Sequence, residues 1–188
     1  MNIDFFCRNQ YGFRAHHSPE YALISLMDRI YKHIDSKRNV LVVSLDLRKA
    51  FEVIRHEILL NKLDNAGIRG PILNWFSSFM TERKHQTLAN NALSDSLCMK
   101  TGIPQGSCLG PLLFLIYIND IIQIFDDEEI NIFADDTVLI VDGENIDEMK
   151  RLANIKLAKL HEYLTANGIQ LNYNKSQYTM YDSSKKRQ

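Results

Sequence analysis

The sequence predicts a single unit of mixed helix and strand, of the α/β or α+β class. Segments with apolar residues at helical spacing alternate along the chain with short apolar runs rich in β-branched residues. The length of 188 residues is enough for one domain with a core and short for two. Hydrophobic residues make up 45% and charged residues 24%, which excludes disordered, collagen-like and coiled-coil chains.

The charge balance limits the ways in which the chain can bind a partner. With 22 basic and 23 acidic residues the net charge is -1, so binding to nucleic acid must depend on a local basic patch or on metal ions. Three cysteines without a CxxC pair favour reduced thiols. Because there is no secretory pattern and no apolar run of membrane-spanning length, we expect a soluble, intracellular protein.

Five helices are predicted from apolar spacing and from residues typical of helix ends. Ser18 and Pro19 are an N-cap and a first-turn proline, and Asn145 with Glu148 resembles a capping box. We assign Phe13, Trp75 and the apolar stripe 112–118 to the core. The expected helices cover residues 19–34, 54–66, 71–80, 112–122 and 145–167.

The predicted strands fall into one buried strand, two hairpins and a short final pair. Residues 40–46 are too apolar for a surface helix and end at an acid, Asp46. We expect residues 86–89 to pair with 97–100 through Asn90-Asn91. A second hairpin joins 130–133 to 137–141, and short strands at 170–171 and 177–181 flank an Asn-rich turn.

Three acids occupy positions where carboxylates are costly. Asp46 ends a buried strand, and Asp135-Asp136 lie together at a tight turn between apolar strands. Helix caps or salt bridges could compensate them. The other solution brings all three together around Mg²⁺, which prefers carboxylate oxygens and also binds phosphate. Two such ions about 3.5–4 Å apart can activate a 3′-hydroxyl and neutralise a leaving pyrophosphate.

Four ordered segments resemble motifs A, B, C and D of reverse transcriptases, in the style of jockey-like non-LTR retrotransposons. They are Asp46 to Phe51, the glycine-framed loop 102–107 that leads into a helix, Phe133-Ala134-Asp135-Asp136, and residues 171–176. Gln10-Tyr11-Gly12-Phe13-Arg14 is similar to the segment that precedes motif A. The resemblance runs from about residue 9 to 181 and implies an α+β polymerase palm, a small antiparallel sheet backed by helices, with partial fingers.

The resemblance also implies the site residues. Asp46 and Asp135 would ligate two Mg²⁺ ions, with Mn²⁺ a possible substitute, and Asp136 would complete the triad or stabilise the turn. Lys175 would give a proton to pyrophosphate or contact phosphate, its alternative being a surface lysine. The substrate-binding residues would be Leu47, Phe51, Gln105 and Gly106. Phe51 would exclude a 2′-OH or belong to the core, and Gln105 with Gly106 would support the nascent base pair or simply open a helix.

The implied partners are an RNA template, a DNA primer and dNTP, in the nucleus and cytoplasm. Glu52 departs from the aspartate usual in the family at that position. We expect the upstream fingers, the thumb and the endonuclease to lie outside this chain, in a larger polyprotein. Two other readings stay open: an inactive remnant or a palm kept as an interaction module, and another palm enzyme such as a cyclase, against which the loop 102–107 argues.

Overall fold

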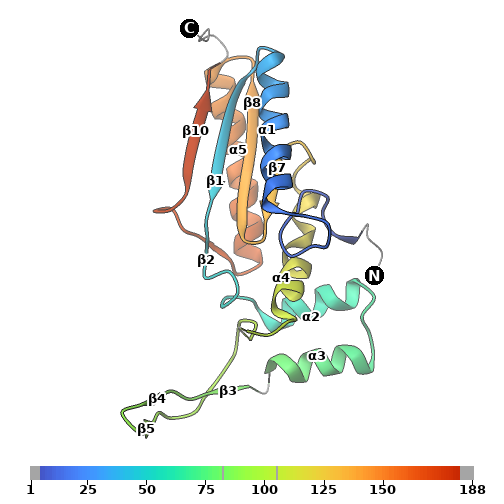
Figure 1. Ribbon diagram of the computed structural model, residues 1–188, viewed down its shortest axis with the longest axis vertical. Helices are drawn as coiled ribbons and strands as arrows, with labels where there is room; N and C mark the ends of the chain where they lie inside the picture. Colours follow the sequence, from blue (N-terminus) through green and yellow to red (C-terminus); the bar gives the residue numbers. More distant parts are fainter. Residues whose placement is uncertain (1–4, 82, 105, 183–188) are drawn as a thin grey trace. The chain divides into compact units, whose positions relative to one another are not determined.

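The computed structural model describes residues 5–81, 83–104 and 106–182, and its elements are labelled in Figure 1. The chain divides into two compact units. The first, which we call the sheet unit, consists of Met1–Arg48 and Asn119–Gln188. The second, the helical unit, is Lys49–Ile118. That the chain as a whole is one palm and partial-fingers domain stays a prediction.

A four-stranded antiparallel sheet in the order β10-β1-β8-β7 forms the centre of the sheet unit. Its longest ladder pairs β1 with β8 along the whole length of β1. The predicted buried strand, the hairpin around Ala134 and the last strand are therefore confirmed. The four strands are β1 (Asn39–Leu45), β7 (Ile130–Phe133), β8 (Asp136–Gly143) and β10 (Gln177–Tyr181).

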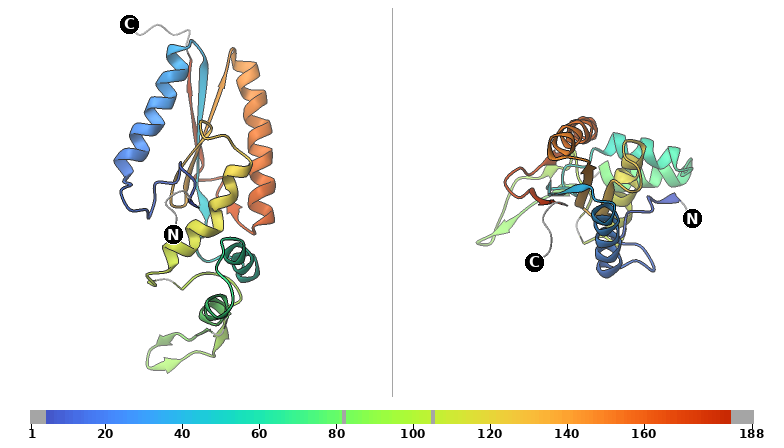
Figure 2. Two further views of the ribbon diagram at one scale, coloured as in Figure 1. Left: turned by 90° about the vertical axis from the view of Figure 1, so that its right-hand side faces the viewer. Right: turned by 90° about the horizontal axis from the view of Figure 1, so that it is seen from above.

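Two helices cover opposite faces of this sheet, as the edge-on view in Figure 2 shows: α1 (Pro19–Asp35) and α5 (Ile146–Ala166). Val40 of β1 packs with Ile30 of α1. Leu41, its neighbour, lines a cavity on the other face together with Met149 of α5. Burial on both faces explains why β1 is a continuous apolar run instead of an alternating one.

Both helices begin at the predicted N-caps. The Ser18 hydroxyl accepts the N–H of Tyr21, and the Asn145 side chain accepts the N–H of Glu148. Each cap satisfies a backbone donor that the first helical turn leaves without a partner. These boundaries follow from local chemistry and agree with the prediction.

A short two-stranded ladder joins the two chain segments that make up the sheet unit. β2 (Leu47–Arg48) pairs with β9 (Gln170–Leu171), so that Leu47 lies opposite Leu171. The chain then turns through residues 172–176 before it enters β10 at the edge of the main sheet. This ladder brings the predicted motif D segment beside the end of β1.

The helical unit contains α2 (His56–Asn65), α3 (Pro71–Thr81) and α4 (Gly110–Ile118). α4 is buried on every side from Leu113 to Ile118, which confirms most of the predicted core stripe. The helix predicted to run to residue 122 changes at Ile118 into a 3-10 helix, η2 (Asn119–Gln123), where the polar residues begin. Of the described helices, none is long and apolar enough to span a bilayer.

Two predictions about single residues are wrong. Phe13 is 56% exposed and Trp75 is 52% exposed, so neither belongs to the core. Trp75 stacks on Phe79 one helical turn later, with ring centroids 5.3 Å apart. This contact covers only part of the indole, because the pair lies on the outer side of α3.

The predicted pairing of 86–89 with 97–100 is also wrong. β4 (Leu88–Ala89) pairs with β5 (Ala92–Leu93), and β3 (Lys84–His85) pairs with β6 (Leu97–Cys98). Asn90 and Asn91 both have positive φ, 50° and 59°, as a two-residue type I′ turn requires. Such a turn places Ala92 directly opposite Ala89, which excludes the longer connection.

Candidate active site

The three predicted acids lie at the same end of the main sheet. Leu45, the last residue of β1, pairs with Thr137 of β8. Asp46 directly follows Leu45, and Asp136 directly precedes Thr137. Because β1 and β8 are antiparallel, the two acids therefore lie at the same end of these neighbouring strands. Asp135 is next to Asp136, in the two-residue turn that joins β7 to β8. Pairing of the strands thus brings together Asp46 and Asp136, which are 90 positions apart in the chain.

These carboxylates influence one another electrostatically. The pKa of Asp136 is raised, first by its partial burial and then by the negative charges of Asp135 and Asp46. Within residues 5–81, 83–104 and 106–182, no salt bridge involves any of the three. The end of the sheet is therefore a concentration of like charge that a cation would stabilise.

The fit to a metal ion is partial. Carboxylate oxygens are the ligands that Mg²⁺ and Mn²⁺ prefer. In the described part of the chain, however, no group of three or more His, Cys, Asp or Glu side chains is arranged to hold a metal ion. The donor chemistry of the three acids therefore suits such an ion, while the described side chains alone do not form a complete metal site.

The predicted motif D segment is tied directly to Asp46. The backbone N–H of Asn172 donates to the Asp46 carbonyl at 2.8 Å, and the Asp46 N–H donates to the Ser176 hydroxyl at 3.3 Å. Lys175 lies in the same turn, with its N–H donating to the Asn172 carbonyl at 3.1 Å, and its side chain is exposed. The turn that carries Lys175 is therefore held at the acid end of β1.

Two of the predicted substrate-binding residues line one cavity inside the helical unit. Phe51 and Gly106 border a space of about 460 Å³, together with Ile103 and Pro104. The loop approaches Phe51 because the Ile103 N–H donates to the Phe51 carbonyl at 2.9 Å. The Phe51 ring stacks on Phe114 of α4, at a centroid distance of 4.6 Å, so this aromatic is held against a buried helix.

The other two substrate-binding predictions differ from this pair. Leu47 is buried and pairs with Leu171, so only its backbone could contact a substrate. Gln105 lies outside the described residues. Leu47 is not among the described residues that line the cavity of Phe51 and Gly106.

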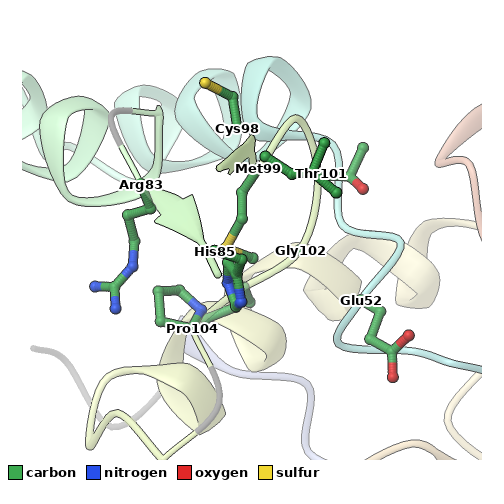
Figure 3. Close-up of a pocket in the computed structure, with 10 residues that line it drawn as sticks. Glu52, Arg83, His85, Cys98, Met99, Thr101, Gly102 and Pro104 are labelled. Atoms are coloured by element: carbon green, nitrogen blue, oxygen red, sulfur yellow. The ribbon is translucent and has the colours of Figure 1, made fainter. Parts of the chain in front are cut away.

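A second cavity of the helical unit, of about 480 Å³, is shown in Figure 3. It lies between the β3–β6 ladder and the start of the glycine-framed loop, with Gly102 and Pro104 on its wall. His85 and Met99 point toward one another there, 2.7 Å apart between Nε2 and Sδ. Of the predicted catalytic and substrate-binding residues that the structure describes, none lines this space.

The sequence reasoning missed the residues that hold the Ala134–Asp135 turn. The Gln10 side chain bonds both the N–H and the carbonyl of Ala134, and Gly12 lies against the same residue. The segment was noticed through its resemblance to the stretch before motif A, but no role was assigned to Gln10. The available signal was the glutamine and glycine of Gln10-Tyr11-Gly12 within that segment.

A small antiparallel sheet flanked by helices, with acids at a strand end and on the adjoining hairpin turn, is the palm of a template-directed polymerase. The chain belongs to the family of reverse transcriptases (RNA-dependent DNA polymerases), whose family model matches residues 1–188. This membership agrees with the resemblance read from the four motifs.

Curated relatives come from retrotransposons. The chain is 28% identical over 164 residues to the probable RNA-directed DNA polymerase from transposon BS of Drosophila melanogaster, covering 84% of this chain and 17% of that protein. It is 30% identical over 132 residues to the corresponding protein from transposon X-element of the same species, covering 68% of this chain and 14% of that one. The chain thus spans less than a fifth of the length of either relative.

Solved structures support the fold. An apo telomerase from Candida tropicalis, truncated from its C-terminal domain, superposes with a TM-score of 0.70 at 12% identity. The match covers 93% of this chain and 36% of the telomerase chain. At this level of identity the likeness establishes the fold alone.

Proposed function

We propose that this chain is the catalytic palm of an RNA-directed DNA polymerase that adds dNTP to the 3′-hydroxyl of a DNA primer on an RNA template. The observation that carries the proposal is the convergence of Asp46, Asp135 and Asp136 at one end of the sheet, with no basic partner in the described chain. Family membership supports the same reaction. The proposed setting is intracellular, in nucleus and cytoplasm.

Asp46 and Asp135 would hold the divalent ions, two Mg²⁺ or Mn²⁺, through their carboxylate oxygens. When bound, such ions lower the pKa of the attacking hydroxyl and neutralise charge on the triphosphate. Asp136 would add negative potential beside them, and its own pKa is raised, first by partial burial and then by the charges of Asp135 and Asp46. Most of the rate enhancement would come from positioning and charge stabilisation.

The remaining residues would select and orient the nucleotide. The Phe51 ring, fixed on Phe114, would oppose a 2′-hydroxyl and so favour dNTP over rNTP. Gly106, at φ 79° with open space around it, allows a substrate to approach the backbone. Lys175 would donate a proton to the leaving pyrophosphate or balance its charge, and Gln105 would contact the nascent base pair.

The test measures metal binding and catalysis separately. The purified chain is titrated with Mn²⁺ while NMR records paramagnetic broadening of the amides near the acids, and primer extension is assayed on an RNA template with Mg²⁺. Asp135→Asn is the test variant. The control is Asp95→Asn, which changes an exposed acid of the other unit.

We expect broadening centred on Asp46, Asp135 and Asp136, and little or no primer extension by the chain alone, because we expect the upstream fingers and the thumb to lie outside it. In a longer protein that contains those parts, incorporation of dNTP should fall about 10³-fold in Asp135→Asn, the loss of several kcal/mol of charge stabilisation. Wild-type and Asp135→Asn chains with identical broadening would overturn the metal site. Metal binding without any extension by the longer protein would overturn the catalytic proposal and favour a palm kept as a non-enzymatic interaction module.

A further inference from the structure

An N-terminal segment pairs with β7, the edge strand of the main sheet. β7 is the last strand in the order β10-β1-β8-β7, and residues 9–12 run beside it. The Tyr11 N–H donates to the Ile132 carbonyl at 2.8 Å, and the Ile132 N–H donates to the Asn9 carbonyl at 2.8 Å. We call residues 9–12 the turn bracket, because they continue from this ladder to the turn that carries Asp135.

Gln10 makes the contact with that turn. Its Oε1 accepts the N–H of Ala134 at 2.9 Å and the N–H of Gly12 at 2.8 Å. Its Nε2 donates to the Ala134 carbonyl at 3.2 Å. The side chain is 2% exposed, so these bonds form away from water, where breaking them is costly. One amide therefore binds both backbone polar groups of the residue before Asp135.

Ala134 needs such support. Its φ is 56°, a left-handed conformation that costs an L-residue with a Cβ roughly 1–2 kcal/mol. Glycine is the usual residue at a turn position with positive φ. Since Ala134 is not glycine, the conformation must be maintained by its surroundings, and the two bonds from Gln10 act on that backbone directly.

Gly12 lets the bracket come this close. A Cβ added at residue 12 would lie 2.2 Å from the Ala134 nitrogen, a distance that no real Cβ contact has. The other end of the bracket is fixed by Asn9, whose Oδ1 accepts from Arg29 Nη2 at 2.6 Å. Arg29 also donates through Nη1 to the Ile130 carbonyl at 2.7 Å, so both ends of β7 are bound.

We propose that Gln10 is a positioning residue that holds the Ala134–Asp135 turn, and through it sets the carboxylates of Asp135 and Asp136 for metal binding. What the acids do rests on the proposed function. The geometry of the turn does not, so the two can fail separately.

The experiment compares Gln10→Leu with the matched control Asn39→Leu. Asn39 is also a buried amide of the sheet unit, and it donates to the Glu144 carbonyl at the opposite end of β1. Both variants lose buried hydrogen bonds and should lower the melting temperature. Only Gln10→Leu should change the three-bond coupling that reports the Ala134 φ, and only it should weaken Mn²⁺ binding at the acids, by about 10–100-fold.

A double variant sharpens the result. Glycine adopts positive φ without help, so Ala134→Gly should restore a large part of the Mn²⁺ affinity that Gln10→Leu loses. Recovery is judged from the Mn²⁺ affinity and not from the melting temperature, because Ala134→Gly is itself expected to stabilise the fold by relieving the left-handed strain.

Two results would overturn the proposal. One is Mn²⁺ affinity in Gln10→Leu within twofold of wild type. The other result comes from hydrogen exchange of the wild-type chain, so it remains available if Gln10→Leu does not fold. The Ala134 amide should exchange as slowly as the amides of the β1–β8 ladder. Exchange at the rate of an exposed loop would exclude its hydrogen bond to Gln10. A wild-type chain that binds no Mn²⁺ at the acids but protects Ala134 would remove the proposed function and leave the bracket standing.

Discussion

Two tight hairpins of this chain reach positive φ by different means. The β4–β5 turn uses Asn90 and Asn91, both left-handed, in a hairpin whose residues are all exposed. The β7–β8 turn uses Ala134 and Asp135, with Ala134 buried at φ 56°. Asparagine tolerates this region because its short polar side chain can hydrogen-bond locally. Alanine has no such means, and its conformation depends on a residue 124 positions away, Gln10.

The difference teaches where each turn is encoded. The conformation of the β4–β5 turn is determined by its own two residues. The conformation of the β7–β8 turn depends on residues outside the turn, and Asp135 in the turn and Asp136 after it supply two carboxylates. A turn that must present Asp135 and Asp136 is relieved of the need for turn-forming residues if another segment holds its backbone.

The largest effect in this comparison should come from Gly12→Ala. The new methyl group would meet backbone atoms of Ala134 at 2.2–2.8 Å, so β7, the turn or the bracket must shift. We expect a loss of about 2–3 kcal/mol in the free energy of unfolding, measured by urea denaturation.

The matched control for this change is Gly67→Ala. Gly67 has φ 88° but open space around it, so only backbone strain is added, about 1 kcal/mol. Equal losses in the two variants would contradict the close approach of the bracket to the turn.

A gain in stability is expected from Ala134→Gly. Removal of the Cβ relieves the left-handed strain, and part of this gain is offset by the greater freedom of glycine in the unfolded chain, for a net of about 0.5–1 kcal/mol. Asn91→Gly in the other hairpin should gain only a few tenths of a kcal/mol, since Asn already suits its turn. Calorimetric melting of both variants measures the difference, and a larger gain at Asn91 would reverse the comparison.

The smallest effect concerns charge. Because the pKa of Asp136 is raised in the folded state, its ionised form destabilises folding at neutral pH. That penalty is fully present above the folded pKa and is gone once the pH falls below the ordinary value of 3.8, where the acid is protonated in both states. Asp136→Asn should therefore raise stability at pH 7 by about 0.5 kcal/mol or less, given its exposure.

Melting temperatures of wild type and Asp136→Asn between pH 3 and pH 7, without divalent ions, measure this term. Millimolar Mg²⁺ should stabilise the wild type and reduce the difference in melting temperature between wild type and Asp136→Asn. A variant less stable than wild type at pH 7 would mean that Asp136 has a stabilising partner, in conflict with the like-charge account.

Much of the fold was readable because it follows from neighbours in sequence. The caps at Ser18 and Asn145, the stop at Gly67 and the acid at the end of β1 each depend on a few adjacent residues. The convergence of the three acids was one of the alternatives that the sequence left open, and the antiparallel pairing of β1 with β8 supplies it by leaving Asp46 and Asp136 at the same end of the sheet.

The sequence by itself determined most of the elements, the capped starts of α1 and α5, and the family to which the motifs point. Only the tertiary structure decided the pairing of the exposed hairpin arm, the exposure of Trp75, the cavity shared by Phe51 and Gly106, and the hold of Gln10 on Ala134. The physical reason is range. Propensities and caps act over one turn of chain, whereas a hydrogen bond between residues 10 and 134 exists only after the whole sheet has assembled around it.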